Sequence, residues 1–462
     1  MKKGLAILLS CAMMLSLTAC ANSGNSGSSG QTSASKTADV VSSAKTETSD
    51  KNYNVEMELT FLTHKQGMED TFASYQAEFN KIYPNVKISY EPIADYKGNI
   101  EMRWSSNDWG DMCMIPHAFL AEEELPNLFA PLGKVDEFDD KYEFAGAFAY
   151  EGNVYGISST GTAYGVLWNK AVLEKAGVTD IPKSIDDFFA VLQKVKDNTD
   201  AIPCYCNYGA GSRLADWEWN ARGSLTGDGD YKNKLIYMEN PFEEGKPYNT
   251  VMRMLYDVVK KGLVEDDPTT STWDSCKNLI ATGQIACTVI GSWACKDAKA
   301  ASETPDDIVF SAFPYNVNGQ QYATVAADYA YAINKNIDPE RYSVCLDYIK
   351  WLTEESNFSF DAGGIPIVKG EAYPDTLKNL QDNNVILVVD NPPKPEDVGL
   401  FDEINETSEL YLGKYPEKAR LVESAMGQSS ETFEEIMKDW NERWSSAQKE
   451  VIGADYASKG SY

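Results

Sequence analysis

The sequence predicts an α/β protein, because stretches with strand periodicity alternate with stretches of helical periodicity. From Val55 to Leu62, apolar residues recur at every second position, which predicts a strand with Met57, Leu59 and Phe61 on one face. Residues 71–82 carry large apolar side chains at helical spacing, and residues 86–90 return to a strand pattern. This order predicts helices packed against a sheet.

The same alternation continues along the chain. Residues 110–115 predict a buried strand that ends at Pro116, and a helical stretch follows at residues 119–124. Ser184 can cap a helix, and Asp187 stands at the capping-box position. The apolar face of that helix would carry Ile185, Phe188, Phe189, Leu192 and Val195. Residues 431–451 predict a long amphipathic helix that buries Phe433, Ile436, Met437, Trp440, Trp444 and Ala447.

The first residues have the features of a secretory signal peptide. Lys2 and Lys3 precede an apolar stretch at residues 5–17, which is short for a membrane span. Leu17-Thr18-Ala19-Cys20 resembles a bacterial lipobox, which implies lipidation of Cys20; an ordinary signal peptide with a chance cysteine is the alternative. Residues 21–50 are mostly small or polar and predict a flexible tether. We expect a signal peptide at 1–19, a lipidated cysteine and linker at 20–54, and a location on the extracellular face of the cell membrane.

Charge and cysteine content exclude several classes of protein. The chain has 41 basic and 70 acidic residues, a net charge of −29, which disfavours nucleic acid and anionic lipid as partners. The seven cysteines beyond Cys20 are odd in number and have no zinc-site spacing. We expect most of them to be small buried apolar residues, with one or two disulfides as the alternative.

Motifs of catalysis are lacking. The chain has two histidines, His64 and His117, and no nucleophile elbow, metalloprotease motif, phosphate-binding loop or dinucleotide fingerprint. Carboxylates are numerous enough that a glycosidase-like pair is expected by chance, and a solvated face is their default role. We therefore expect a protein that is not an enzyme and has no cofactor and no metal.

Aromatic residues point instead to carbohydrate binding. The chain has 10 Trp and 26 Tyr, and several stand beside turns or strand ends, such as Tyr164, Trp217, Trp219 and Trp293. A flat ring covers the apolar face of a sugar, while polar side chains bind its rim of hydroxyl groups. Core packing is the alternative for each ring, and it is the expectation for Trp440 and Trp444.

Four stretches in a fixed order carry a resemblance to a known family. They are residues 155–170 continued by Leu173-Glu174-Lys175-Ala176-Gly177-Val178 and Pro182, residues 279–293 ending in Gly291-Ser292-Trp293, residues 330–334 followed by 342–356, and residues 431–451. The chain resembles the extracellular solute-binding proteins of ABC importers, in the carbohydrate-binding family that includes maltose-binding protein. Trp168 stands where that family usually has Tyr, and Cys287 where Met is common.

The resemblance implies a two-lobe periplasmic-binding-protein-like (type II) fold with hinged lobes and a ligand cleft between them. The N-terminal lobe would comprise residues 55–161 and 325–366, and the C-terminal lobe residues 162–324 and 367–462. Trp293 would be the stacking ring, whereas Asp328-Tyr329 stands where relatives often carry Gly-Gly. The ligand-binding residues implied are Thr63, His64, Gln66, Pro116, His117, Thr162, Tyr164, Tyr205, Asn207, Trp217, Trp219, Trp293, Asp328 and Tyr329.

The function implied is capture of a carbohydrate, in particular an oligosaccharide, and its delivery to the permease subunits of an ABC importer. We expect a monomer that binds sugar and no nucleic acid. Two alternatives stay open: a solute-binding protein for a peptide, a polyamine or a sugar phosphate, and a surface-anchored glycoside hydrolase.

Overall fold

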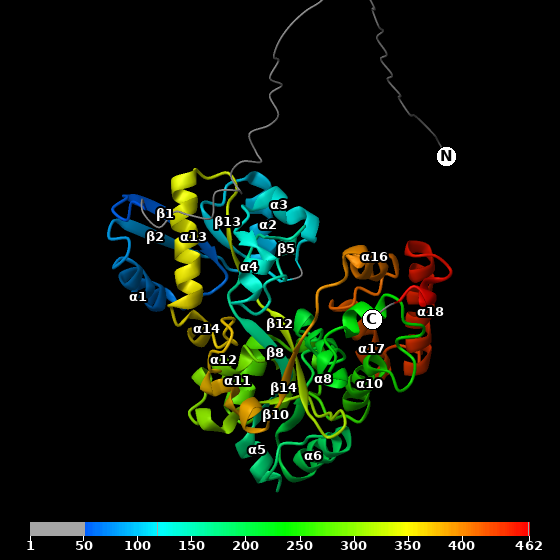
Figure 1. Ribbon diagram of the computed structural model, residues 1–462. Coiled ribbons are helices and arrows are strands. Elements are labelled where there is room, and N and C mark those ends of the chain that lie inside the picture. The colour runs from blue at the N-terminus through cyan, green and yellow to red at the C-terminus, as the bar shows by residue number, and fades with distance from the viewer. Residues whose placement is uncertain (1–50, 118, 461) are drawn as a thin grey trace, which may run out of the picture. The chain divides into compact units, whose positions relative to one another are not determined.

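A computed structural model describes residues 51–117, 119–460 and 462, and residues 53–462 form one compact unit (Figure 1). The predicted signal peptide, Cys20 and nearly all of the predicted linker lie outside the described residues. None of the described helices is long and apolar enough to span a membrane.

The first lobe is built on a five-stranded sheet and includes the blue, cyan and most of the yellow elements of Figure 1. Its strands, in spatial order, are β2 (Val86–Pro92), β1 (Met57–Thr63), β3 (Met112–Ile115), β13 (Ala330–Ile333) and β7 (Ile157–Ser158). β1 is parallel to β2 and β3, whereas β13 returns antiparallel to β3. Strand β13 therefore joins this sheet from a distant part of the chain.

Helices and a small second sheet complete the first lobe. Its helices are α1 (Glu69–Phe79), α2 (Tyr96–Ser106), α3 (Leu125–Leu128), α4 (Val135–Asp139), α13 (Pro339–Glu354) and α14 (Phe358–Asp361). The small sheet has the order β4 (Gly133–Lys134), β6 (Asn153–Val154) and β5 (Ala149–Tyr150). Aromatic side chains fill the core, in which Phe61 contacts Tyr331 and Tyr348 edge to face.

The second lobe is built on a six-stranded sheet. Its strands are β14 (Ile386–Val389), β12 (Tyr322–Ala327), β8 (Gly161–Asn169), β10 (Ile285–Gly291) and β9 (Ile202–Tyr205) in spatial order, with β11 (Ile308–Ala312) paired to β8. The nine-residue strand β8 pairs with β12 near its start and with β10 and β11 further along. This strand is the centre of the lobe.

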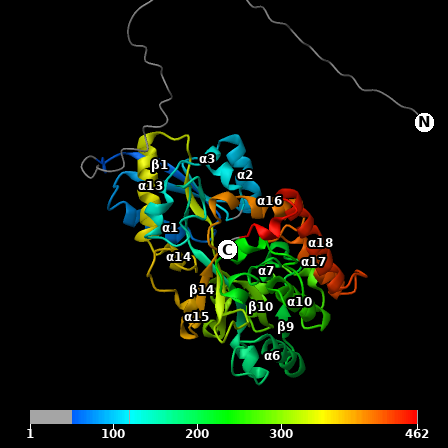
Figure 2. The same cartoon turned by 45° about the vertical axis from the view of Figure 1, so that its right-hand side comes forward.

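Short and long helices surround that sheet, and the last three are coloured orange to red in Figure 1. They are α5 (Lys170–Lys175), α6 (Ile185–Asn198), α7 (Asp216–Trp219), α8 (Gly223–Thr226), α9 (Tyr231–Leu235), α10 (Pro247–Lys260), α11 (Trp273–Ala281), α12 (Ala294–Ala301), α15 (Lys378–Asp382), α16 (Leu400–Thr407), α17 (Pro416–Ala425) and α18 (Phe433–Val451). Figure 2 shows α7 next to β10, with α17 and α18 on the same side of the lobe.

The α/β class and several element signals are confirmed. The side chain of Ser184 accepts a hydrogen bond from the N–H of Asp187 at 3.2 Å and caps α6. α18 buries Trp440 and Trp444 completely.

The seven cysteines beyond Cys20 are buried free thiols, so no disulfide forms among the described residues. No described group of His, Cys, Asp or Glu side chains has the arrangement of a metal site.

The helical stretch predicted at residues 119–124 was wrong in extent. A 3₁₀ turn covers Glu122–Glu124, and α3 begins only at Leu125. A continuous helix would place Pro126 in its interior, where proline lacks the N–H and clashes with the preceding turn. In the structure Pro126 lies in the first turn of α3, where this proline is tolerated.

We expect Arg341→Met to lower the free energy of unfolding by about 2 kcal/mol. Asp111 is almost fully buried; its carboxylate accepts two hydrogen bonds from Arg341, both at 2.7 Å, and one from the N–H of Thr60 at 2.8 Å. The substitution leaves that charge without its cation. The loss stays below that of a fully buried pair because Arg341 is 32% exposed.

Urea unfolding followed by circular dichroism measures this loss. Arg103→Met is the matched control in the same lobe, because the ion pair of Arg103 with Glu91 is exposed on both sides and contributes less than about 1 kcal/mol. Equal midpoints for the two variants would contradict the role given to Asp111.

Candidate functional site

Three chain segments cross between the lobes within the described residues, and they bring the candidate site together. Ser159 and Thr160 connect β7 to β8, Asp328 and Tyr329 connect β12 to β13, and Gly364 precedes a bridge between Ile365 and Gly161. The first two segments are joined by backbone hydrogen bonds, from Ser159 to Tyr329 at 2.8 Å and from Asp328 to Thr160 at 2.9 Å. At Gly364 an added Cβ would lie 2.4 Å from the Cβ of Thr160, so this close approach requires glycine.

On the side of the first lobe, two predicted residues stack on each other. The ring of His64 lies over that of Tyr329, with centroids 3.7 Å apart, and Tyr96 contacts both rings edge to face. The Nδ1 atom of His64 is buried without a hydrogen-bond partner. Burial holds the pKa of His64 well below its usual range, with smaller contributions from Lys65 and Lys97. This histidine is therefore neutral near pH 7.

On the side of the second lobe, Tyr164 of β8 stacks on Trp219 of α7. The two rings are nearly parallel, with centroids 4.9 Å apart, and the Arg222 guanidinium lies 4.4 Å from the centroid of Trp219. Arg222 is buried and forms an ion pair with Asp390 at 2.7 Å. β8, α7 and the segment after β14 thus converge on one aromatic pair.

A second aromatic group lies at the end of β10. Trp293 is half-buried, contacts Trp273 edge to face at 4.8 Å, and has the Arg213 guanidinium 4.9 Å from its ring centroid. Arg213 also forms an ion pair with Asp216 of α7 at 3.5 Å. A Cβ at Gly291 would lie 2.5 Å from Nε1 of Trp293, so a larger residue at the end of β10 would displace the Trp293 ring.

The two lobes contact each other through His117 and Trp219, whose ring centroids are 6.1 Å apart. His117 follows β3 of the first lobe, and burial together with Lys232 and Arg222 lowers its pKa to about 4. Lys97 of α2 interacts electrostatically with Arg213, Asp328 and Asp216. Groups from both lobes therefore face one another here. We name this set the interlobe cluster: His64, Tyr96, Lys97, His117, Tyr164, Arg213, Asp216, Trp219, Arg222, Lys232, Trp293, Asp328, Tyr329 and Asp390.

Buried polar atoms without hydrogen-bond partners recur in the interlobe cluster. They are Nδ1 of His64, Oδ2 of Asp216, Nε of Arg222 and Oδ1 of Asp390. Burial raises the pKa of Asp216, against the opposing effect of Arg213. Buried polar atoms without hydrogen bonds are costly, and these four lie beside the stacked rings, which fits a site whose remaining hydrogen-bond partners are hydroxyl groups of a ligand.

Seven of the predicted ligand-binding residues lie in the interlobe cluster: His64, His117, Tyr164, Trp219, Trp293, Asp328 and Tyr329. Thr63, Pro116 and Thr162 are buried next to it, and the hydroxyl of Thr63 donates to the sulfur of Met114. Gln66 is exposed, and no contact connects it to the interlobe cluster.

Three predicted residues lie elsewhere, and for these the structure corrects the expectation. Trp217 is fully buried in the core of the second lobe against Phe313, so its ring has no face for a ligand. Tyr205 is 5% exposed and packs in the core. Asn207 is 1% exposed, and its amide donates to the hydroxyl of Thr288 at 2.8 Å.

Several residues of the interlobe cluster were not predicted from the sequence: Tyr96, Lys97, Arg213, Asp216, Arg222, Lys232 and Asp390. Asp216 and Arg222 flank the stretch with Trp217 and Trp219, and polar side chains beside aromatic rings are a local signal for a site that binds a hydroxylated ligand. Asp390 lies 168 positions from Arg222 and carries no such signal.

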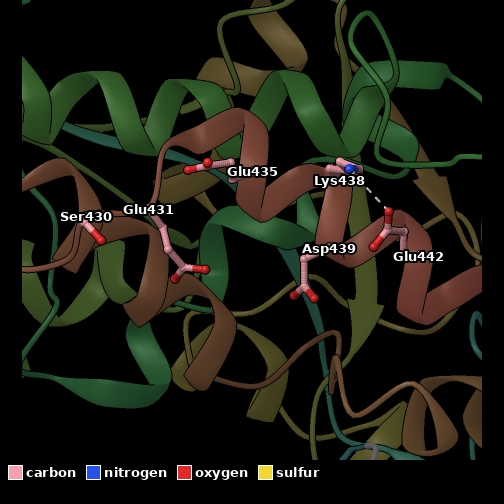
Figure 3. A pocket seen from close by; sticks show the side chains of 6 residues that line it. All are labelled: Ser430, Glu431, Glu435, Lys438, Asp439 and Glu442. Atoms are coloured by element: carbon pink, nitrogen blue, oxygen red, sulfur yellow. Dashed lines mark ion pairs between the residues drawn. The ribbon is translucent and has the colours of Figure 1, made fainter.

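A hollow of about 400 Å³ elsewhere on the second lobe is not a competing site. It lies along α18 and is lined by Ser430, Glu431, Glu435, Lys438, Asp439 and Glu442 (Figure 3). Its acidic side chains already have partners: Glu431 and Asp439 pair with Arg420, Lys438 pairs with Glu442, and Glu435 caps the helix. No aromatic ring lines it.

Comparison with known proteins identifies the family of this chain. A family model described as bacterial extracellular solute-binding protein matches residues 73–383. An uncharacterised ABC transporter extracellular-binding protein of Pyrococcus horikoshii is 24% identical over 313 residues, which cover 65% of this chain and 69% of that protein. The chain belongs to the family of extracellular solute-binding proteins, which places it outside the cytoplasm.

Two solved structures from Bifidobacterium animalis subsp. lactis ATCC 27673 are similar over nearly their whole length. One is a manno-oligosaccharide specific solute-binding protein, BlMnBP2, in complex with mannotriose: 33% identity, TM-score 0.79, and coverage of 86% of this chain and 96% of that chain. The other is the ABC transporter binding protein BlMnBP1 in complex with mannobiose, with 34% identity, TM-score 0.80 and the same coverage. The fold is that of the two-lobe solute-binding proteins, as predicted.

We expect the stability of the protein to fall as the pH decreases from about 6.5 toward 4, in part because of His117. Its pKa is about 4 in the folded state and near 6.5 in the unfolded chain, so only the unfolded chain binds this proton in that window. His117→Gln removes this contribution. Its loss of stability between pH 7 and 5 should be smaller than that of the wild type by about 1 kcal/mol, since the ring is partly exposed.

Thermal unfolding monitored at several pH values measures that difference. Parallel pH profiles for the wild type and His117→Gln would show that the folded state does not hold His117 neutral.

Proposed function

We propose that the protein is the substrate-binding component of an ABC importer and binds a manno-oligosaccharide of two or three sugar units. The observation that carries this proposal is the interlobe cluster, where stacked rings from both lobes adjoin buried polar atoms that lack partners. Flat rings suit the apolar faces of pyranose units, and carboxylates accept hydrogen bonds from their hydroxyl groups. The ligands of BlMnBP1 and BlMnBP2 support the choice of sugar.

The positions at which the chain crosses between the two lobes suit a hinge that lets the lobes close around a ligand. We propose that the lobes comprise residues 55–160 with 328–365 and residues 161–327 with 366–462. These boundaries differ by one to three residues from those expected from the sequence, 55–161 with 325–366 and 162–324 with 367–462, and they keep β8 and β12 whole within the second lobe. The crossing segments at 159–160, 328–329 and 364–365 would then act as the hinge. A sugar that contacts His117 on one lobe and Trp219 on the other favours the closed arrangement by its higher affinity for it. The permease subunits would bind this closed form.

Attachment to the membrane is a separate part of the proposal. We propose that residues 1–19 are removed, that Cys20 is lipidated, and that the residues up to 54 tether a monomeric binding unit to the outer face of the cell membrane. Metabolic labelling with palmitate tests this: the wild type should incorporate label, and Cys20→Ser should lose the label and appear in the medium. Labelling of Cys20→Ser equal to that of the wild type would contradict it.

A thermal-shift panel tests the choice of ligand, because a ligand that binds only the folded state raises Tm by mass action. Mannobiose and mannotriose should raise Tm by several degrees, whereas maltotriose, chitotriose, spermidine and mannose 6-phosphate should have smaller effects. Stabilisation by spermidine or by the sugar phosphate alone would support the non-sugar alternatives and reject the proposal. Mannotriose recovered intact after incubation would separate binding from hydrolysis; new reducing ends would indicate a glycosidase.

A further inference from the structure

A buried ion pair lies directly behind the helix that carries Trp219. Glu218 of α7 and Lys418 of α17 are 1% and 0% exposed, and Nζ of Lys418 pairs with Oε2 of Glu218. The same carboxylate accepts a hydrogen bond from the N–H of Gly413 at 2.8 Å and from the hydroxyl of Tyr248 at 3.4 Å. Two separate segments of the second lobe, α10 and the stretch at residues 413–418, therefore hold one carboxylate.

α7 depends on such contacts for its position. It has four residues and no side-chain N-cap, and a single helical turn is not stable by itself. The buried ring of Trp217 anchors α7 in the core, but apolar contacts have no preferred direction. Hydrogen bonds and ion pairs to Glu218 are directional and fix the rotation of the helix about its axis. Asp216 and Trp219 belong to the same turn, so a rotation would displace both.

Stability alone does not call for charges at these two positions. A buried ion pair can often be replaced by apolar side chains of similar volume without loss of stability, because removing two charges from water is costly. The directional contacts of Glu218 are what such a replacement would remove. The contact chain also continues to the ligand side, because Tyr248 interacts electrostatically with Arg222, which lies over the Trp219 ring.

We propose that Glu218 and Lys418 are positioning residues that hold α7 in the rotation at which Trp219 and Asp216 face the interlobe cluster. The affinity readout of this inference rests on the proposed function, whereas the orientation of Trp219 does not.

The test uses the double substitution Glu218→Met/Lys418→Met in the whole protein. Either single substitution would leave a buried charge without its counter-ion and could prevent folding. The double variant should keep a Tm within a few degrees of the wild type, and its Kd for mannotriose, measured by calorimetry, should rise about tenfold. Leu192→Ala is the matched control, because Leu192 is fully buried in α6 of the same lobe. It should lower Tm and leave Kd within twofold.

Nuclear magnetic resonance of the ¹⁵N-labelled indole groups provides the readout that needs no ligand. The Trp219 resonance, assigned with Trp219→Phe, should shift or broaden in the double variant, while that of Trp109 in the first lobe stays in place. An unchanged Trp219 resonance would overturn the positioning role, as would an unchanged Kd. If the wild type binds no mannotriose, the proposed ligand fails, and the indole resonances still decide whether the ion pair positions Trp219.

Discussion

Replacing Trp219 with alanine is expected to weaken mannotriose binding by about 3 kcal/mol, roughly 150-fold in Kd. Trp219 contacts Tyr164 and Arg222 within its own lobe and His117 on the other. Large aromatic side chains at the centre of a binding site contribute most to affinity, because they bury apolar area and shield neighbouring hydrogen bonds from water. Truncation would also leave the Tyr164 ring without its stacking partner.

Calorimetry at 25 °C measures the effect, with Trp109→Phe as the control. Trp109 is 1% exposed in the core of the first lobe, so its substitution should leave Kd within twofold. Wild-type affinity in Trp219→Ala would exclude this ring from the site and with it the interlobe cluster as the place of binding.

Replacing Asp216 with alanine is expected to weaken mannotriose binding by about 2.5 kcal/mol, roughly 70-fold in Kd. Its Oδ2 atom is buried and forms the 3.5 Å ion pair with Arg213 but no hydrogen bond, so it can still accept one from a sugar hydroxyl. Hydrogen bonds to a charged acceptor are stronger than neutral ones, and Asp216 has the cation of Arg213 beside it. Asp216→Asn keeps an acceptor oxygen and should lose less affinity than Asp216→Ala.

The matched control for Asp216 is Asp257→Ala. Asp257 lies on α10 of the same lobe and pairs with Lys261 in the next turn of the helix, outside the interlobe cluster. Calorimetry should give wild-type affinity for this variant. Equal affinities for Asp216→Ala and Asp257→Ala would show that Asp216 accepts no hydrogen bond from the ligand.

Much of the fold could be predicted from the sequence, because local signals determine its elements. The cap at Ser184 and the long apolar face of α18 depend on residues close together in the chain, and both lie as predicted. Strand β13 was also predicted, although its pairing with β3 joins segments more than 200 residues apart. The family resemblance placed residues 325–366 in the N-terminal lobe but named no partner for this strand, and alternation alone does not specify one.

The candidate site could be predicted only in part, because distant segments build it. His64, His117 and Tyr329 follow strand ends, where a loop residue next to a sheet edge is a reasonable candidate. Lys97 stands between Tyr96 and Gly98, and Asp390 precedes Asn391 and two prolines, but these local signals do not say which distant residues lie beside them. Asp390 interacts with His117 because the two lobes pack against each other.

Trp217 and Trp219 show where the prediction failed. Side chains two residues apart lie on the same face of a strand. On a helix they are about 200° apart and point to opposite sides. The segment forms α7, so one ring enters the core and the other faces the interlobe cluster. The sequence Asp-Trp-Glu-Trp contains no signal that shows which of the two rings enters the core and which faces the interlobe cluster.

Hydrogen–deuterium exchange with and without mannotriose tests most directly whether a sugar is held between the two lobes. Peptides that cover residues 112–120 of the first lobe and residues 214–222 of the second should both exchange more slowly when the ligand is bound, and peptides along α18 should not change. Protection confined to one lobe, or centred on α18, would contradict binding in the interlobe cluster.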